Sequence, residues 1–117
     1  MSLVNTKEYK HLEKLLFENE TIKASIVGEI ESIAYLVAFT QSRLFLVKKQ
    51  IDIFVKVQQF GLEEIFDIKI SFVGDIFDVV LYVKDKPIIK IDYLEANISK
   101  DFSKKLFEAI NLWINNI

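Results

Sequence analysis

Few side chains in this sequence are of the kinds that perform catalysis, and they are scattered along the chain. His11 is the single histidine, and it lies next to Lys10 and Leu12 with no serine nucleophile beside it. Carboxylates gather in two segments, Glu63, Glu64 and Asp67 in one and Asp75 and Asp78 in the other. General acid–base catalysis needs two such groups in one cleft with separated pKa values. We interpret these carboxylates as turn and strand-edge charges, and we predict no catalytic residue and no enzyme activity.

Metal and cofactor sites are not indicated either. The chain has no cysteine, so it has no thiolate ligand and no disulfide framework. Its aspartates do not follow the spacing of a calcium-binding loop. One group of cations stands out, because Lys48, Lys49 and Lys56 fall on or beside two neighbouring predicted strands. We predict at most a weak anion patch there, since lysines on exposed strands also discourage edge-to-edge aggregation.

The composition is that of one small globular domain. Its 117 residues are 51% hydrophobic and 27% charged, with a net charge of −2. This charge gives no field that would collect nucleic-acid phosphates, so we predict no nucleic-acid partner. The longest apolar run, residues 33–39, is far shorter than the ~20 residues of a membrane-spanning helix. A secretory signal pattern is missing and cysteine is absent, so we predict a cytoplasmic protein.

Alternation of apolar and polar residues dominates the middle of the chain. Phe66, Ile68 and Ile70, for example, alternate with Asp67 and Lys69, and are predicted to face inward. Turn signals recur about every ten residues, which leaves no room for crossover helices and implies antiparallel neighbours. The pattern predicts seven strands, at residues 21–30, 33–40, 43–49, 51–59, 65–73, 76–84 and 87–94. Seven such strands suffice for a small barrel or a strongly bent sheet.

Both ends of the chain change to a helical period. Near the N-terminus, Asn5 and Glu8 have the offset of a capping box, and Leu12 and Leu16 follow at helical spacing. Near the C-terminus, Ser99 is a candidate N-cap, and an apolar stripe follows at Phe102, Leu106, Ile110, Trp113 and Ile117. We therefore predict an N-terminal helical extension over residues 1–18 and a sheet domain over residues 19–117, which the second helix closes.

Three segments carry a resemblance to a known family. Residues 20–28 form a strand, and residues 35–47 form a hairpin in which Thr40 and Arg43 stand in a Thr-x-x-Arg pattern. Residues 60–68 make an acidic connection into the next strand. On these motifs, roughly residues 19–116 resemble the bacterial pleckstrin-homology-like (PH-like) domains of the YokE type.

The resemblance implies a fold that is mainly β in class. It would be a seven-stranded antiparallel bent sheet or barrel capped by a C-terminal amphipathic helix, with the short N-terminal helix as an addition. The resemblance also implies an interaction or scaffold module without catalysis. Turn chemistry accounts for Thr40 and Arg43 without a ligand, since the hydroxyl can bond turn amides and the guanidinium can bond exposed carbonyls or a nearby carboxylate.

Phosphoinositide binding is not favoured by the loop between the first two predicted strands. In eukaryotic PH domains that bind these lipids, this loop carries a cluster of lysines and arginines. Here it carries Glu29 and Glu31. Because two carboxylates would repel an anionic headgroup, the sequence argues against phosphoinositide recognition.

The predicted strand at 33–40 is unusual because both of its faces are apolar. On the face away from the expected core stand Ala34, Leu36 and Ala38. A strand in a single-layer barrel has one face toward solvent, so something must cover these side chains. Two elements can cover these side chains: the N-terminal helix of the same chain or a second subunit. The second alternative predicts a self-association surface comprising Ala34, Leu36, Ala38 and Phe54.

Together these features predict a non-catalytic PH-like interaction or scaffold module that self-associates or binds another protein. The alternative is a small carrier, in which the apolar interior of the barrel opens at one end to admit a lipid or another apolar ligand. A small barrel is usually filled by its own side chains, which favours the interaction module. Neither alternative calls for a cofactor.

Overall fold

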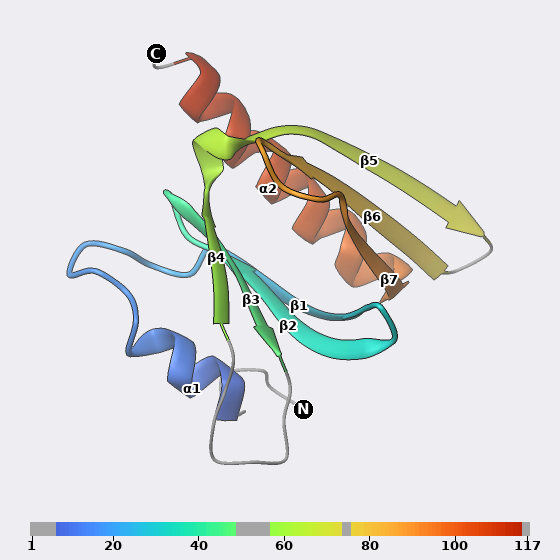
Figure 1. Cartoon of the computed structure of the whole chain (residues 1–117), viewed down its shortest axis with the longest axis horizontal. Coiled ribbons are helices and arrows are strands. Elements are labelled where there is room, and N and C mark those ends of the chain that lie inside the picture. Colours follow the sequence, from blue (N-terminus) through green and yellow to red (C-terminus); the bar gives the residue numbers. More distant parts are fainter. Residues whose placement is uncertain (1–6, 49–56, 74–75, 116–117) are drawn as a thin grey trace.

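The chain forms one antiparallel sheet with a helix at each end of the sequence (Figure 1). The computed structural model describes residues 7–48, 57–73 and 76–115. The helices are α1 (Lys7–Glu13) and α2 (Ala96–Asn115), and a short 3-10 helix, η2, spans Leu62–Glu64. The strands are β1 (Ala24–Ile30), β2 (Ile33–Phe39), β3 (Arg43–Lys48), β4 (Val57–Gly61), β5 (Ile65–Val73), β6 (Ile76–Val83) and β7 (Ile89–Glu95).

The sheet is a meander that bends back on itself. Its strand order is β4-β3-β2-β1-β7-β6-β5, and every pair of neighbours is antiparallel. β1 and β7 are joined through the single pair Glu29 and Asp92, where the sheet turns. The result is two layers, β1 to β4 and β5 to β7, with β4 and β5 at the outer ends of the strand order (Figure 1).

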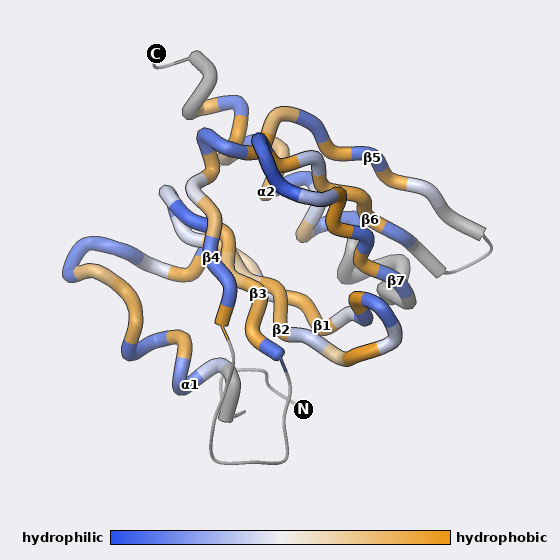
Figure 2. The backbone as a smooth tube through the Cα atoms, viewed as in Figure 1, coloured by the Kyte–Doolittle hydropathy of each residue, from blue (hydrophilic) through white to orange (hydrophobic). Residues whose placement is uncertain are grey.

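The main core lies between these layers and α2. The helix packs on β1, β6, β7 and η2, and it turns Phe102, Leu106 and Ile110 toward the sheet. Phe39 of β2 meets Phe102 edge to face, with ring centroids 5.4 Å apart. Burial of such side chains stabilises the fold by roughly 1.5–3 kcal/mol each. Figure 2 shows the apolar stretches of β1, β2 and β3 that line this side of the core.

The predicted fold class is confirmed, including the seven antiparallel strands and the helix that follows them. The boundaries differ by a few residues. β1 starts at Ala24, and α2 starts at Ala96, before the predicted cap Ser99. The N-terminal helix is present but short, since α1 ends at Glu13, and the strand predicted from residue 51 is described from Val57 onward.

One inward-facing prediction is wrong in β5. The pairing of β5 with β6 shifts register between Ile65 and Asp67, which is the signature of a β-bulge. Ile65 is buried, whereas Phe66 is 67% exposed and its ring lies 6.0 Å from that of Tyr82. Simple alternation places Phe66 inside, because it assumes an unbroken strand. The extra residue of the bulge turns this side chain out of the core.

Candidate interaction surfaces

A buried ion pair between Glu20 and Arg43 lies next to the β2–β3 turn. The guanidinium and the carboxylate are 15% and 4% exposed, and Nε of Arg43 donates to Oε2 of Glu20 at 2.9 Å. The same carboxylate accepts from the Thr40 hydroxyl at 2.7 Å, from the Ser42 hydroxyl at 3.0 Å and from the backbone N–H of Phe17 at 2.9 Å. Hydrogen bonds therefore satisfy both charges within the chain.

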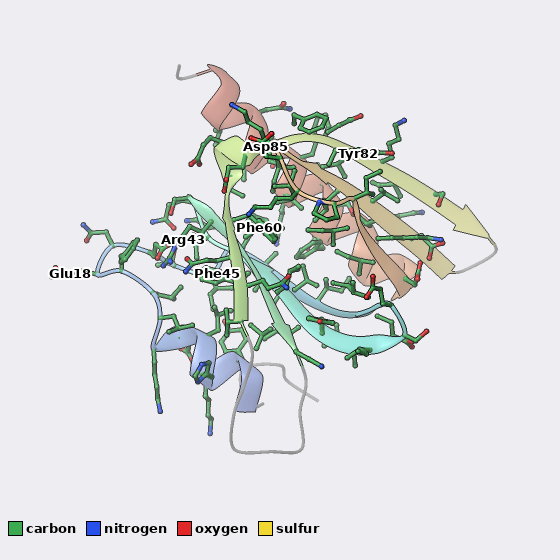
Figure 3. The ribbon with its side chains drawn as sticks, viewed as in Figure 1. Glu18, Arg43, Phe45, Phe60, Tyr82 and Asp85 are labelled. Carbon is green, nitrogen blue, oxygen red and sulfur yellow. The ribbon has the colours of Figure 1, made fainter. Side chains whose placement is uncertain are left out.

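Arg43 also ties together three separate segments. Its Nη2 donates to the carbonyl of Leu15 at 3.1 Å, and its Nη1 donates to Gln59 of β4. The guanidinium carbon lies 4.1 Å from the ring centroid of Phe17 and 4.6 Å from that of Phe45. Figure 3 labels Arg43 and Phe45. Each guanidinium nitrogen is thus engaged, so Arg43 has a structural role and is not available to a phosphate.

The contacts around Glu20 shift the pKa of its carboxyl group. The Arg43 guanidinium lowers the pKa of Glu20 from 4.5 to about 2, against the opposing effect of burial. Hydrogen bonds from Phe17, Thr40 and Ser42 add to the lowering. Sequence analysis identified the arginine and offered exposed carbonyls or a nearby carboxylate as its partners, but did not identify Glu20 or the carbonyl of Leu15. The two residues are 23 positions apart, and no local spacing signals such a pair.

The outer face of β2 and β3 is covered by the N-terminal segment. Leu36 is 2% exposed and Ala38 is fully buried, and they form a second apolar cluster with Phe45, Val47 and Leu12 of α1. Tyr9, Leu16, Ile22, Val27 and Val57 pack around this cluster. Of the two coverings left open above, the structure shows the helix of the same chain (Figure 1).

The predicted self-association surface is therefore largely covered by the chain itself. Leu36 and Ala38 lie beneath α1 and offer no area to a second subunit in this structure, while Ala34 is half-buried. Phe54 lies outside the described residues. The physical reason is that the extension at residues 1–18 carries leucines at helical spacing, and the apolar face of β2 and β3 is a nearby surface on which Leu12 is buried.

Most of the predicted anion patch lies outside the described residues, and the other candidate residues lie on separate elements. Lys48 is half-buried at the end of β3, and Lys49 and Lys56 lie outside the described residues. His11 is half-buried on α1, and Glu64 accepts from the backbone N–H of Gly61 at 2.8 Å. Across residues 7–48, 57–73 and 76–115, no group of three or more His, Asp or Glu side chains is arranged to hold a metal ion.

A cavity of about 490 Å³ opens at the end of the sheet that holds the β1–β2 and β6–β7 turns. Tyr35, Gln58 and Phe60 line its walls, and its rim carries one cation, Lys86, and one carboxylate, Glu31. A phosphorylated headgroup needs several converging cations to bind tightly. This end of the molecule, in the part that the structure describes, does not supply them.

Two hollows flank α2. One, of about 560 Å³, lies between the helix and the ends of β1 and β2, and Phe39, Ala109 and Leu112 line it together with Lys23, Gln41, Lys105 and Glu108. The other, of about 350 Å³, lies between the helix and β5 and is lined by Ile70, Lys100, Ser103, Lys104, Phe107 and Glu108. Both hollows are mainly apolar, as binding sites for apolar groups are.

Several large apolar side chains on β5 and α2 are exposed. Of the eight large hydrophobic residues that are exposed in the described part, half belong to β5 or α2, namely Phe66, Ile70, Phe107 and Leu112. Phe107 and Ile70 both line the smaller hollow, and Leu112 lines the larger one. Large exposed apolar side chains on neighbouring elements are a feature that interaction sites share.

Comparison with solved structures identifies the fold. A pleckstrin homology domain from Shewanella amazonensis SB2B matches with a TM-score of 0.66 and 17% identity, over 86% of this chain and 93% of that chain. The complex of PDZ-RhoGEF DH/PH domains with activated RhoA matches with a TM-score of 0.59 and 14% identity, over 92% of this chain. This chain spans 34% of the length of that second match.

Comparison by sequence gives no match: no protein-family model fits the chain, and no curated protein is significantly similar to it. Among the residues described, no helix has the length and apolarity to cross a membrane. The fold is nevertheless clear from the strand order, the bend between β1 and β7, the position of α2 and the two structural matches. The chain has the pleckstrin-homology-like fold.

Proposed function

We propose that this protein is a non-catalytic PH-like interaction module that self-associates in the cytoplasm. The observation that carries the proposal is the set of large exposed apolar side chains on β5 and α2, namely Phe66, Ile70, Phe107 and Leu112, which we call the β5–α2 surface. Large exposed hydrophobic side chains cost free energy in water, and a protein contact recovers it. We place the self-association surface at the β5–α2 surface and not at the outer face of β2, because α1 covers Leu36 and Ala38.

The fold supports an interaction role. A PH-like sheet appears in the PDZ-RhoGEF structure, which was solved as a complex with another protein, RhoA. In this chain the buried carboxylate of Glu20 is engaged in structural hydrogen bonds, including one from Arg43. We also propose that residues 1–18 are an extension that covers the β2–β3 face, and that residues 19–117 are the PH-like domain.

A second function, carriage of an apolar ligand, is favoured by one observation. The hollow of about 560 Å³ between α2 and the ends of β1 and β2 has the size of a small-molecule site, and its walls are mainly apolar. A lipid tail would contact Phe39 and Leu112, and Lys23 or Lys105 would lie near a polar head. Lys48, Lys49 and Lys56 remain a proposed weak anion patch, tested by vesicle binding of the triple alanine variant.

Native mass spectrometry of the purified protein separates the two functions. A discrete oligomer at a multiple of the bare chain mass of 13.7 kDa is expected for the interaction module. A monomer with extra mass that organic extraction removes would support the carrier instead. A bare monomer at all concentrations would overturn self-association.

A matched pair of variants locates the contact. Phe66→Asp places a charge on the β5–α2 surface, where the side chain is 67% exposed, and is expected to yield a folded monomer. Ile88→Asp makes the same change at a residue that is 61% exposed in the β6–β7 turn, and the oligomer should persist. Equal effects of both variants would argue against the β5–α2 surface.

A further inference from the structure

The outer edge of β5 has the properties of a pairing edge. Among the strands that the structure describes, β5 stands at one end of the sheet order and has a neighbour, β6, on one side (Figure 1). It is the longest of these strands, with nine residues, and its exposed side chains include two large apolar ones, Phe66 and Ile70. The edge strand of a sheet presents backbone groups that another strand can bond, and the N–H of Ile68 here donates to Oδ1 of its neighbour Asp67 at 2.9 Å.

The other end of the sheet is different. β4 has five residues, and two of its side chains are the exposed glutamines Gln58 and Gln59. Gln59 accepts a hydrogen bond from Arg43, which lies between β4 and the N-terminal segment. The polar side chains of this described part of β4 make it a poor edge for pairing.

The charges on β5 are arranged so that the strand complements itself. Past the bulge, β5 pairs regularly with β6 from Asp67 to Val73, so Asp67 and Lys69 lie on the outer face and Ile68 between them faces the core. Both charged side chains are exposed. A second β5 strand, placed antiparallel with a two-fold axis at Ile68, brings each Asp67 opposite the Lys69 of the other copy.

Other two-fold axes along the regular part of β5 do not give this match. An axis at Lys69 places two lysines opposite one another, and an axis at Asp67 does the same with two aspartates. An axis at Ile70 leaves Lys69 opposite Ser71 and pairs no opposite charges across the axis. Opposite charges directly across a strand pair stabilise it, and like charges destabilise it, so the Ile68 axis is favoured.

Apolar contacts on the inner face fit the same register. The Ile68 side chains of the two copies are directly opposed, and Ile70 of one copy lies diagonal to Ile68 of the other, within side-chain reach. Ile70 is 46% exposed because α2 packs on β6 and β7 and leaves this edge partly open. Phe107 of α2 lines the hollow next to Ile70.

We infer that β5 is the homodimer interface of this protein, in which two copies pair antiparallel about a two-fold axis at Ile68 and join their sheets. The inference rests on the proposed self-association and adds its partner, strand and register. The occupant of this edge is a second copy, because Asp67 and Lys69 complement the same strand and the flanking side chains are apolar on both sides of the axis.

Charge exchange at these two positions tests the register. Asp67→Lys alone and Lys69→Asp alone each create two like-charge pairs per dimer, and each is expected to raise the dimer dissociation constant by at least about tenfold. The double variant Asp67→Lys with Lys69→Asp restores two opposite-charge pairs, so its dissociation constant should return to within about threefold of wild type. Sedimentation equilibrium over a range of concentrations measures all four proteins.

One variant serves as a control, and three different results would each contradict a different part of the inference. Lys84→Asp makes the same charge change at an exposed residue of the β6–β7 turn and should leave the dimer intact. A wild-type oligomer that neither single variant weakens would overturn the β5 interface and leave self-association standing. Single variants that weaken the dimer without recovery in the double variant would overturn the Ile68 register. A wild-type protein that is monomeric throughout would overturn both.

A cysteine cross-link provides a second measurement. The chain has no cysteine, so Ile68→Cys introduces a single thiol per copy without background. Directly opposed residues of antiparallel strands have Cβ atoms ~4.5–5.5 Å apart, which mild oxidation can bridge with a small adjustment. We expect a covalent dimer from Ile68→Cys and none from Ser71→Cys, which this register holds apart. Cross-linking through Ser71→Cys instead would overturn the register.

Discussion

The outer face of β2 and β3 and the edge strand β5 both carry large apolar side chains, but the described residues cover only the first set. Under α1, Leu36 is 2% exposed and Ala38 is fully buried. On β5, Phe66 is 67% exposed and Ile70 is 46% exposed. A small sheet that is apolar on its exterior needs a cover, and the extension provides one at β2 and β3. At β5 the same need points to a second molecule.

The cover at β2 and β3 is held by polar contacts as well as by leucines. Glu20 and Arg43 connect the segment after α1 to β3, and Arg43 reaches back to the carbonyl of Leu15. Phe17 lies against the guanidinium. Since the ion pair closes the N-terminal segment onto the sheet, breaking it tests how firmly the cover is held.

The largest effect is expected from Arg43→Ala. Glu20 would then be a nearly buried carboxylate without its cation, and breaking a buried pair in this way typically costs about 3–5 kcal/mol of unfolding free energy. Urea denaturation measures the loss. As a control, Lys105→Ala breaks an exposed pair with Asp101, 3.1 Å long, and should cost less than about 0.5 kcal/mol. Similar losses for both variants would show that the ion pair does not hold the cover.

Truncation of one apolar side chain in each region compares them directly. Leu36→Ala removes a buried side chain beneath α1, and we expect it to lower the unfolding free energy by about 3 kcal/mol. Ile70→Ala on the edge of β5, where the side chain is 46% exposed, should cost about half as much or less in the monomer. Thermal denaturation at low protein concentration gives both values. Equal losses would mean that α1 adds little burial at Leu36.

Acid should loosen the covered region in a defined pH range. The pKa of Glu20 is about 2 in the folded chain against 4.5 normally, so its contribution to stability is complete above pH 4.5 and is lost as the pH falls toward 2. The shift corresponds to about 3 kcal/mol at most. We expect the stability difference between wild type and Glu20→Gln to shrink over this range. A difference that does not change with pH would contradict the role of the carboxylate charge.

The repetitive parts of the fold could be predicted from sequence, because they follow local periods. Alternation located the strands, and the stripe through Phe102, Leu106 and Ile110 located the buried face of α2. Alternation did not predict the bulge before Asp67. One extra residue in the strand turns the Phe66 side chain to the other face of the sheet, while the pattern of residue types stays the same. A residue-by-residue period cannot reveal such a shift.

The candidate sites were harder to predict, because they depend on which distant segments meet. Thr40 and Arg43 were recognised as a structural pair, but their acceptor Glu20 lies in a segment with no regular pattern. Likewise, the apolar outer face of β2 identified a need for a cover but did not choose between α1 and a second copy. Only the packing of Leu12 against Leu36 resolves that choice.

The smallest effect on folding is expected at Phe66, where the contrast between the two regions is sharpest. This side chain is 67% exposed and packs against the ring of Tyr82. Phe66→Asp should therefore lower the unfolding free energy of the monomer by about 1 kcal/mol or less. The same change should abolish the oligomer. Chemical denaturation and sedimentation of one sample separate the two effects. A large loss of stability would instead make Phe66 part of the fold, and the β5–α2 surface would lose its strongest argument for being an interface.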